Sequence, residues 1–84
     1  MRHNQPKGMR QAIVTKYLGP TNTRGSRISV RAQAGRRIYA WDDGLDVDEN
    51  HTVAAHRFAN TMGWSTRLAG GAMPDNTGYV FVMI

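Results

Sequence analysis

The segment SRISVRAQA, residues 26–34, alternates apolar and polar side chains along its length, and this period of two constrains the fold more than any other feature. In an extended strand, Ile28 and Val30 fall on one face, and Arg27 and Arg31 fall on the other. Such a strand packs one face on a core and turns the other to solvent, as in antiparallel sheets. The pattern therefore predicts an antiparallel sheet with a basic outer face.

Five further segments complete the expected fold. Apolar and β-branched runs predict strands at residues 10–18, 37–41, 66–73 and 79–84, and an apolar stripe at helical spacing predicts a helix at residues 49–62. We expect Asp48 or Asn50 to cap the helix and Phe58 to be buried. Gly63 should end the helix in the left-handed conformation, with Trp64 in a Schellman-type contact. The predicted fold is α+β: one mainly antiparallel sheet of four to five strands, in the order β-β-β-α-β-β, with a single helix packed on one face.

The chain is short enough for one domain. Its 84 residues would bury only ~60–65 % of the unfolded surface, which leaves a thin core. Residues 1–8 contain proline, glycine and no apolar side chain after Met1, so we expect a flexible basic arm there. A single small α+β domain should follow over residues 9–84, and Met9 is an alternative start.

Cysteine is absent, which excludes disulfides and thiolate zinc sites, so the chain does not need an oxidising compartment. The longest apolar run, residues 79–84, is far shorter than the ~20 residues of a membrane span. The polar N-terminus lacks the apolar centre of a signal peptide. We therefore expect a cytoplasmic protein that does not bind membranes.

The turn between the second and third expected strands decides where two aromatic side chains lie. A two-residue turn, at 34–35 or 35–36, places Tyr39 and Trp41 on the core face, whereas a three-residue turn places them on the basic face. Rings interleaved with arginines would form a stacking platform for single-stranded nucleic acid. The scarcity of other large apolar side chains favours the core position without excluding the basic one.

Charge divides the chain into a basic front half and an acidic rear half. Residues 1–40 carry nine bases and no acid, whereas residues 41–84 carry two bases and six acids. Nine of the eleven bases are arginine, whose planar guanidinium binds phosphate in two-point geometry. The composition favours phosphate contacts, and the alternative is a solvated basic surface.

The connection GPTNTRGSRI, residues 19–28, concentrates polar donors around two guanidinium groups. The donors are Thr21, Asn22, Thr23 and Ser26, and the guanidinium groups are those of Arg24 and Arg27. As structure, Pro20, Asn22 and Gly25 suit turns, and the segment is a long connection between strands. As function, its backbone N–H groups form an anion-binding nest flanked by the arginines. The sequence supports both interpretations.

The sequence contains no convincing catalytic or metal site. Residues 46–57 begin like a calcium loop, but His51 stands where glycine is required and Arg57 where a glutamate should bind the ion. His51 and His56 are five residues apart, so they do not share a helical face as metal ligands, and we expect both on the surface. No serine has an obvious neighbouring base, and LAGGA lacks the lysine of a P-loop. We expect a protein that is not an enzyme and that binds neither metal nor cofactor.

The segment IVTKYLGPTNTRGSRI, residues 13–28, resembles a segment found in a family of small uncharacterised proteins of tailed phages, prophages and other bacterial genomes. The similarity continues through NHTVAAHRFANTMGW, residues 50–64, and GYVFV, residues 78–82. It therefore spans most of the chain after Met9. The resemblance implies a mobile-element setting and supplies no catalytic residues. Phage proteins of this size often bind nucleic acid or block a host protein.

Two functions are expected from these features. The first is a basic, non-enzymatic accessory protein that binds DNA or RNA with weak sequence preference. Its phosphate contacts would come from Lys16, Arg24, Arg27, Arg31, Arg36 and Arg37, with Thr21, Asn22, Thr23 and Ser26 as further donors. About four phosphate contacts on duplex DNA predict a log–log salt slope of roughly −3 to −4. The second is a protein-binding module or inhibitor that meets an acidic partner, and the opposite charges of the two halves also favour a homodimer.

Overall fold

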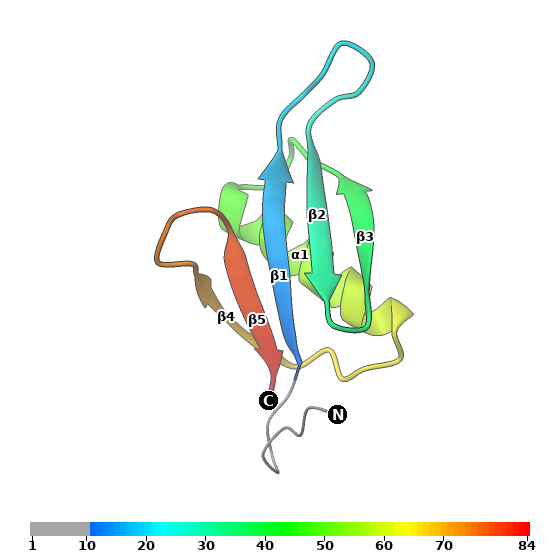
Figure 1. Cartoon of the computed structure of the whole chain (residues 1–84), viewed down its shortest axis with the longest axis vertical. Coiled ribbons are helices and arrows are strands. Elements are labelled where there is room, and N and C mark those ends of the chain that lie inside the picture. Colours follow the sequence, from blue (N-terminus) through cyan, green and yellow to red (C-terminus); the bar gives the residue numbers. More distant parts are fainter. Residues whose placement is uncertain (1–10) are drawn as a thin grey trace, which may run out of the picture.

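The structure, a computed structural model, describes residues 11–84 as one antiparallel sheet with one helix on one of its faces (Figure 1). The elements are β1 (Ala12–Leu18), β2 (Arg27–Ala32), β3 (Gly35–Ala40), α1 (Val47–Thr61), β4 (Leu68–Ala72) and β5 (Tyr79–Met83). The strands lie in the order β3-β2-β1-β5-β4. The predicted α+β class and the β-β-β-α-β-β order are confirmed. The arm predicted at residues 1–8 lies outside the described residues.

Strand β1 forms the centre of the sheet because it pairs with both β2 and β5. Ile13 lies opposite Phe81 of β5, and Tyr17 lies opposite Ile28 of β2. Since side chains alternate along a strand, the odd-numbered residues of β1 face α1 and the even-numbered residues face away. The register of the strand pairs therefore assigns each strand residue to one of the two faces of the sheet.

The core lies between the sheet and α1. It consists of Ile13, Ile28, Val30 and Phe81 from the strands, and of Ala54, Ala55, Phe58 and Ala59 from the helix. Phe58 is fully buried, as predicted. The short alanine side chains let α1 lie close against β1 and β2. This packing fixes the helix over the middle of the sheet.

The first turn of α1 is capped by Asp46, so the predicted caps Asp48 and Asn50 were wrong. The Asp46 carboxylate accepts the N–H of Glu49 at 2.8 Å, and the Glu49 carboxylate accepts the N–H of Asp46 at 3.0 Å. This reciprocal pair satisfies two backbone donors at once. Asn50 is buried instead, and its side chain both donates to the Asp42 carbonyl and accepts the Asp42 N–H, each at 2.9 Å. Asn50 thus holds the preceding loop rather than the helix terminus.

The helix ends as predicted, in a Schellman motif. Gly63 has a φ of 73°, a left-handed conformation that glycine adopts readily. The Trp64 N–H donates to the Ala59 carbonyl at 2.8 Å. The Gly63 N–H donates to the Asn60 carbonyl at 3.1 Å. The Trp64 ring packs edge-on against Phe58, with 5.8 Å between the centroids, and this contact directs the chain toward β4.

The turn between β2 and β3 consists of residues 33–34, so both predicted positions, which began one or two residues later, were wrong. The Gln11 side chain accepts the Ala34 N–H at 3.0 Å and so holds the turn at this place. The two-residue length preserves the predicted alternation. Tyr39 and Trp41 accordingly pack against the core, which confirms the favoured position.

His51 is buried, so its predicted surface position was wrong. Its Nδ1 lies 2.6 Å from the Thr15 hydroxyl on β1. The imidazole also packs against the rings of Trp41 and Tyr79, with centroid distances of 5.9 and 4.3 Å. Burial lowers the pKa of His51, and the nearby charge of Asp48 opposes that shift. A hydroxyl from a distant strand makes this burial possible, and no local sequence pattern reveals such a partner.

Candidate nucleic-acid interface

One face of the sheet carries no helix, because α1 packs against the other face (Figure 1). We call this surface the open face. It comprises Ala12, Val14, Lys16 and Leu18 of β1, Arg27, Ser29 and Arg31 of β2, Arg36, Ile38 and Ala40 of β3, Ala69 and Gly71 of β4, and Val80 and Val82 of β5. The alternation predicted for residues 26–34 is what places the basic side chains of β2 here.

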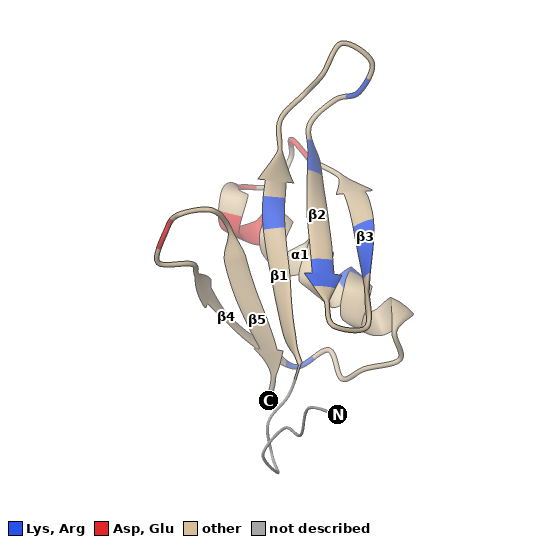
Figure 2. Cartoon of the chain, in the orientation of Figure 1, with Lys and Arg blue, Asp and Glu red and all other residues tan. Residues whose placement is uncertain are grey.

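Arg31 and Arg36 lie directly opposite one another across the β2–β3 pair. Such side chains have Cβ atoms about 4.5–5.5 Å apart, and like charges in this position destabilise a sheet. Lys16 on β1 lies opposite Ser29 and is therefore a diagonal neighbour of Arg31. Figure 2 shows basic positions on each of the three neighbouring strands β1, β2 and β3. An anion placed among them would relieve their repulsion.

The three cations line an open groove of about 560 Å³. Ser29 lies at its floor and is only 7 % exposed. The opposite wall comes from the β4–β5 turn, which contributes Met73, Asp75 and Thr77. Hydrogen bonds from the hydroxyl and the N–H of Thr77 lower the pKa of Asp75, and the charge of Lys16 lowers it further. The groove thus has a basic wall and a smaller acidic one.

The β1–β2 connection, residues 19–26, stands out beyond the end of the sheet (Figure 1). The Thr21 hydroxyl accepts the N–H of Arg24 at 3.1 Å and that of Thr23 at 3.4 Å. The Arg24 carbonyl accepts the Thr21 N–H at 2.8 Å. The N–H groups of Thr21, Thr23 and Arg24 already have partners within the loop, so these three are not free to bind an anion. The side chains of Asn22, Thr23 and Arg24 are exposed on the loop.

The base of the loop is held by two side-chain contacts. The Ser26 and Tyr17 hydroxyls are 2.9 Å apart. Nε of Arg27 donates to the Gly25 carbonyl at 3.3 Å. Ser26 and Arg27 therefore have structural partners of their own, whereas Asn22 is exposed near the tip.

Arg37 does not join the open face. It lies opposite Val30, whose side chain belongs to the core, and consecutive strand residues point to opposite faces. Its Nη1 donates to the Arg36 carbonyl at 2.9 Å. The predicted site residues thus divide into three groups: Lys16, Arg27, Arg31 and Arg36 on the open face, Thr21, Asn22, Thr23, Arg24 and Ser26 on the loop, and Arg37 on the other side of the sheet.

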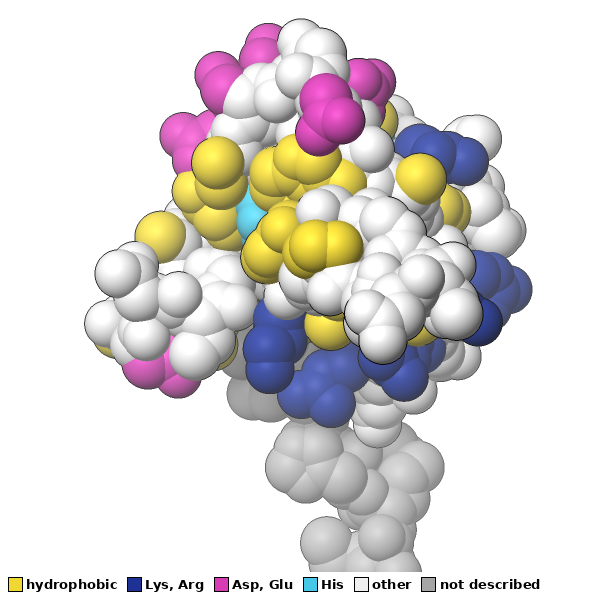
Figure 3. Space-filling model, turned by 90° about the horizontal axis from the view of Figure 1, so that it is seen from above, with side chains coloured by type: hydrophobic (Ala, Val, Ile, Leu, Met, Phe, Trp, Pro, Cys, Tyr) yellow, Lys and Arg dark blue, Asp and Glu magenta, His cyan; other side chains and the backbone are white. Residues whose placement is uncertain are grey.

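Acidic side chains gather around the start of α1, away from the basic strands (Figure 3). They are Asp42, Asp43, Asp46, Asp48 and Glu49. Those in the first turn of α1 complement the positive end of the helix dipole. The charge separation along the sequence is thus preserved in three dimensions.

The open face also carries apolar side chains. Val14 and Val80 are half-buried opposite one another, Val82 is 38 % exposed, and Ile38 is 42 % exposed beside the cations. An apolar row of this kind is more typical of a protein-binding surface than of a phosphate-binding one. The open face therefore combines basic side chains suited to phosphate with apolar side chains suited to a protein partner.

Aromatic rings of the described strands all lie on the α1 side of the sheet. Tyr17 and Tyr39 lie opposite Ile28, and Tyr79 and Phe81 lie opposite odd-numbered residues of β1. The open face of residues 11–84 consequently has no ring on which a base can stack. Contacts made there would be to phosphates rather than to bases.

The structure also contains a cleft that the sequence did not indicate. Asp48, Thr52 and His56 of α1 face Leu68 and Phe81 across a hollow of about 550 Å³. A signal was present in the helix, because these three polar residues are spaced four apart and share one face. Nothing in the sequence showed that β4 would lie beside them.

Two further observations concern the described residues. In the range 11–84, His, Asp and Glu side chains form no group of three or more that could hold a metal ion. α1, the one helix in this part of the chain, is not long and apolar enough to cross a membrane.

Comparison with known proteins adds no family assignment. No protein-family model matches the chain, and no curated protein or solved structure matches it either. Function is therefore argued from the geometry of the site.

Proposed function

We propose that the protein is a non-enzymatic nucleic-acid binder whose open face contacts the phosphate backbone. The direct Arg31–Arg36 pair, with Lys16 beside it, is the observation that carries this proposal. Like charges held opposite one another destabilise the free protein, and phosphate oxygens between them replace repulsion with charge-assisted hydrogen bonds. The groove of about 560 Å³ beside them leaves room for such a group.

The same geometry favours binding with weak sequence preference. Without rings on the open face, the protein contacts charge rather than bases. Duplex DNA releases more counterions per contact than a single strand does, so duplexes should bind at least as tightly. Arg24 and Arg27 extend the basic track toward the loop, where Asn22 adds a further donor. The proposed setting is the cytoplasm of a cell that carries a phage or other mobile element.

The salt dependence of binding tests this proposal. Contacts from Lys16, Arg31 and Arg36 to three phosphates predict a log–log salt slope of about −3 on duplex DNA. Replacing both arginines, Arg31→Ala with Arg36→Ala, should flatten the slope by about two units. Arg37→Ala removes one charge from the opposite face and should leave the slope unchanged. Fluorescence anisotropy with a labelled duplex, measured over a salt series, gives all three slopes.

Two results would contradict the proposal. The first is that the parent protein fails to bind duplex or single-stranded DNA at low salt. The second is that Arg37→Ala flattens the slope by about one unit, the effect of losing one phosphate contact, because the open face would then have no special role. A separate double change, Arg24→Ala with Arg27→Ala, tests the loop: an unchanged slope would make it a connection only.

A second candidate function is a protein-binding module or inhibitor with an acidic partner. The apolar side chains of the open face favour it, since Ile38 is exposed on the same strand as Arg36 and Val82 is exposed on β5. Val82→Ser should leave the salt slope of DNA binding unchanged if phosphates alone are bound. Sedimentation of the free protein tests the homodimer that this candidate allows.

A further inference from the structure

We propose that the cleft between α1 and β4 binds an extended basic peptide, which adds to the free edge of β4 as a sixth, antiparallel strand. The site uses the α1 side of the molecule and not the open face. It goes beyond the proposed nucleic-acid function and does not depend on it.

The cleft has one wall from the helix and one from the sheet. Asp48, Thr52 and His56 line the helical wall. Leu68 and Phe81 supply apolar surface on the other side. Its volume of about 550 Å³ lies within the range of sites that accept several side chains. An occupant therefore meets polar groups on one side and apolar groups on the other.

The ring of Phe81 lies close to Gly70, and both residues line this cleft. Gly70 faces the cleft, and a Cβ atom there would overlap the ring of Phe81, so the position cannot carry a side chain without moving that ring. α1 packs over β1 and β2 and leaves the α1 side of β4 less covered. The hollow is thus a consequence of helix placement, and the absence of a side chain at Gly70 lets the Phe81 ring lie against β4.

The backbone of β4 has free hydrogen-bonding groups along its outer edge. The Met73 N–H donates to the Gly78 carbonyl at 2.8 Å, and the Ile84 N–H donates to the Arg67 carbonyl at 3.0 Å. Odd-numbered residues of β4 therefore bond to β5, because bonded and non-bonded pairs alternate in antiparallel sheets. The N–H and C=O groups of the even-numbered residues, Leu68, Gly70 and Ala72, point to the free edge.

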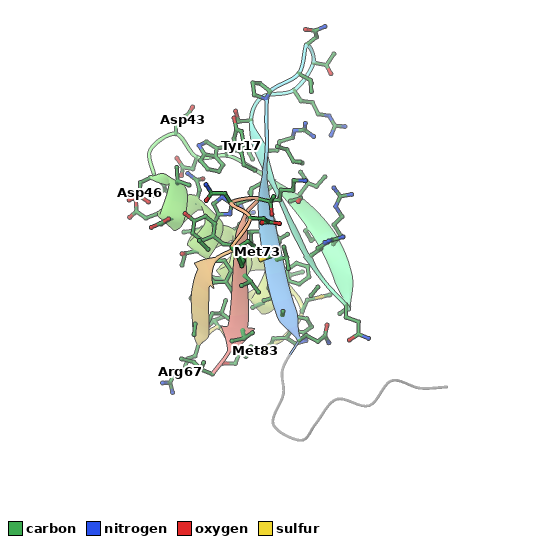
Figure 4. The ribbon with its side chains drawn as sticks, turned by 60° about the vertical axis from the view of Figure 1, so that its left-hand side comes forward. Tyr17, Asp43, Asp46, Arg67, Met73 and Met83 are labelled. Atoms are coloured by element: carbon green, nitrogen blue, oxygen red, sulfur yellow. The ribbon has the colours of Figure 1, made fainter. Side chains whose placement is uncertain are left out.

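This edge lacks the features that usually prevent strand addition. Edge strands are commonly protected by lysine, proline or a bulge. β4 consists of Leu-Ala-Gly-Gly-Ala, pairs with β5 in unbroken register, and stands at the outer edge of the sheet (Figure 4). Residues 69–72 are exposed. An added strand would meet neither a charge nor a steric block along them.

The charges at the two ends of the cleft favour a basic peptide and determine the direction in which it binds. Asp48 lies at the Ala72 end of the cleft, where its carboxylate accepts the Tyr79 hydroxyl. Glu49 stands beside it in the first turn of α1, and Asp46 caps that turn. Arg67 precedes the other end of β4, as Figure 4 shows. A lysine or arginine therefore belongs opposite Ala72, and apolar side chains belong nearer Leu68. Edge pairing with side-chain pockets is a known mode of peptide recognition.

The probe follows from this geometry. The capped peptide Thr-Lys-Thr-Val-Thr-Val-Thr, placed antiparallel to β4, turns its lysine toward Asp48 and its valines toward Gly70 and Leu68. Its threonines face away from the cleft. In antiparallel pairing the lysine and valine N–H groups point to β4 and the threonine N–H groups point to solvent. ¹H–¹⁵N NMR titration of the full chain should shift the amide signals of residues 68–72 and of the cleft-facing turns of α1.

Modified peptides separate strand addition from nonspecific attraction. N-methylation of the lysine and first valine removes two donors and should weaken binding about tenfold or more. The same number of methyl groups on the threonines should leave affinity within about twofold, since those N–H groups face solvent. Replacement of the lysine by glutamate should weaken binding about five- to tenfold at low salt.

A matched pair of protein variants tests the charge. Asp48→Asn should weaken binding of the lysine peptide about three- to fivefold, and Asp43→Asn, which removes the same charge outside the cleft, should not. The proposal is overturned if both methylated peptides lose affinity equally, or if the shifted signals map to the open face. It is also overturned if sedimentation shows a dimer whose β4 signals are unaffected by peptide, because the occupant would then be a second copy of the chain.

Discussion

The buried contact between Thr15 and His51 makes a sharp prediction about stability. Both side chains are almost completely enclosed, at 0 % and 2 % exposure, and Oγ1 of Thr15 lies 2.6 Å from Nδ1 of His51. Thr15→Val keeps the shape of the side chain and removes only the hydroxyl. The His51 nitrogen then stays buried without its partner.

The expected loss of unfolding free energy is about 1–3 kcal/mol, the cost of leaving a buried polar group unpaired. The total stability of a domain this small is only about 4–12 kcal/mol. With an m-value near 1 kcal/mol/M, the urea midpoint should fall by about 1–3 M at pH 7.5. Circular dichroism during urea titration measures this shift. The double variant Thr15→Val with His51→Leu should lose less than the sum of the two single changes, because no polar partner is then left unpaired.

The pH dependence supplies an independent check. Burial lowers the pKa of His51 below the value of about 6.5 expected in the unfolded chain. Between these two pKa values the unfolded chain binds more protons, so the His51 contribution is complete above pH 6.5 and is lost as the pH falls through the folded pKa. His51→Leu should lack this part of the acid destabilisation. The reasoning is refuted if Thr15→Val matches the parent midpoint at pH 7.5, or if His51→Leu loses stability on acidification as steeply as the parent.

Two further predictions concern the backbone. Gly78→Ala should destabilise the protein by about 1–3 kcal/mol, because the new Cβ would overlap the Thr15 carbonyl, whereas Gly71→Ala meets open space and should change stability by less than about 1 kcal/mol. Equal thermal midpoints for these two variants would contradict the close approach of β5 to β1. Asp46→Ala should cost about 1 kcal/mol through loss of the helix cap, and Asp43→Ala should cost less than about 0.5 kcal/mol. Thermal unfolding measures both, and a larger loss for the Asp43 variant would show that Asp46 is not the cap.

Periodic patterns were the part of the sequence that predicted structure well. The alternation over residues 26–34 was enough to identify β2 and its basic outer face. The alanine stripe with Phe58 was enough to identify α1 and its inner side. Both patterns reflect contact with one core, and each can be read from neighbours within a few residues.

Features that depend on distant partners were harder to predict. His51 interrupts an apolar helical face, and only the Thr15 hydroxyl from β1 explains its burial. The cap was assigned to Asp48 or Asn50 because several acids stand close together, and only the reciprocal bonds of Asp46 and Glu49 distinguish them. Choices among similar neighbouring residues are settled by geometry rather than by composition.

The candidate site was likewise predictable only where a residue's position depends on the alternation within its own strand. Arg31 was placed on the outer face by the alternation of its own strand. The separation of Arg36 from Arg37 depends on the turn at residues 33–34, which pairs Arg36 with Arg31 and Arg37 with Val30. A turn one residue longer would exchange the faces of the two arginines. The cleft beside β4 depends on the pairing of β4 with β5 and on the position of α1, so no single segment predicted it.

The central position of β1 has a consequence for protein synthesis. Ala12 pairs with Val82, 70 residues later in the chain, so one edge of the central strand has no partner until β5 leaves the ribosome. The strands β1, β2 and β3 and the helix are synthesised before β5. Until β5 follows, the edge of β1 that will pair with it is exposed to chaperones, proteases or other chains. A chain interrupted before residue 79 would lack the strand that joins β4 to the rest of the sheet. Without β5, the edge of β1 that includes Ala12 stays unpaired, and an unpaired edge of this kind can pair with other chains.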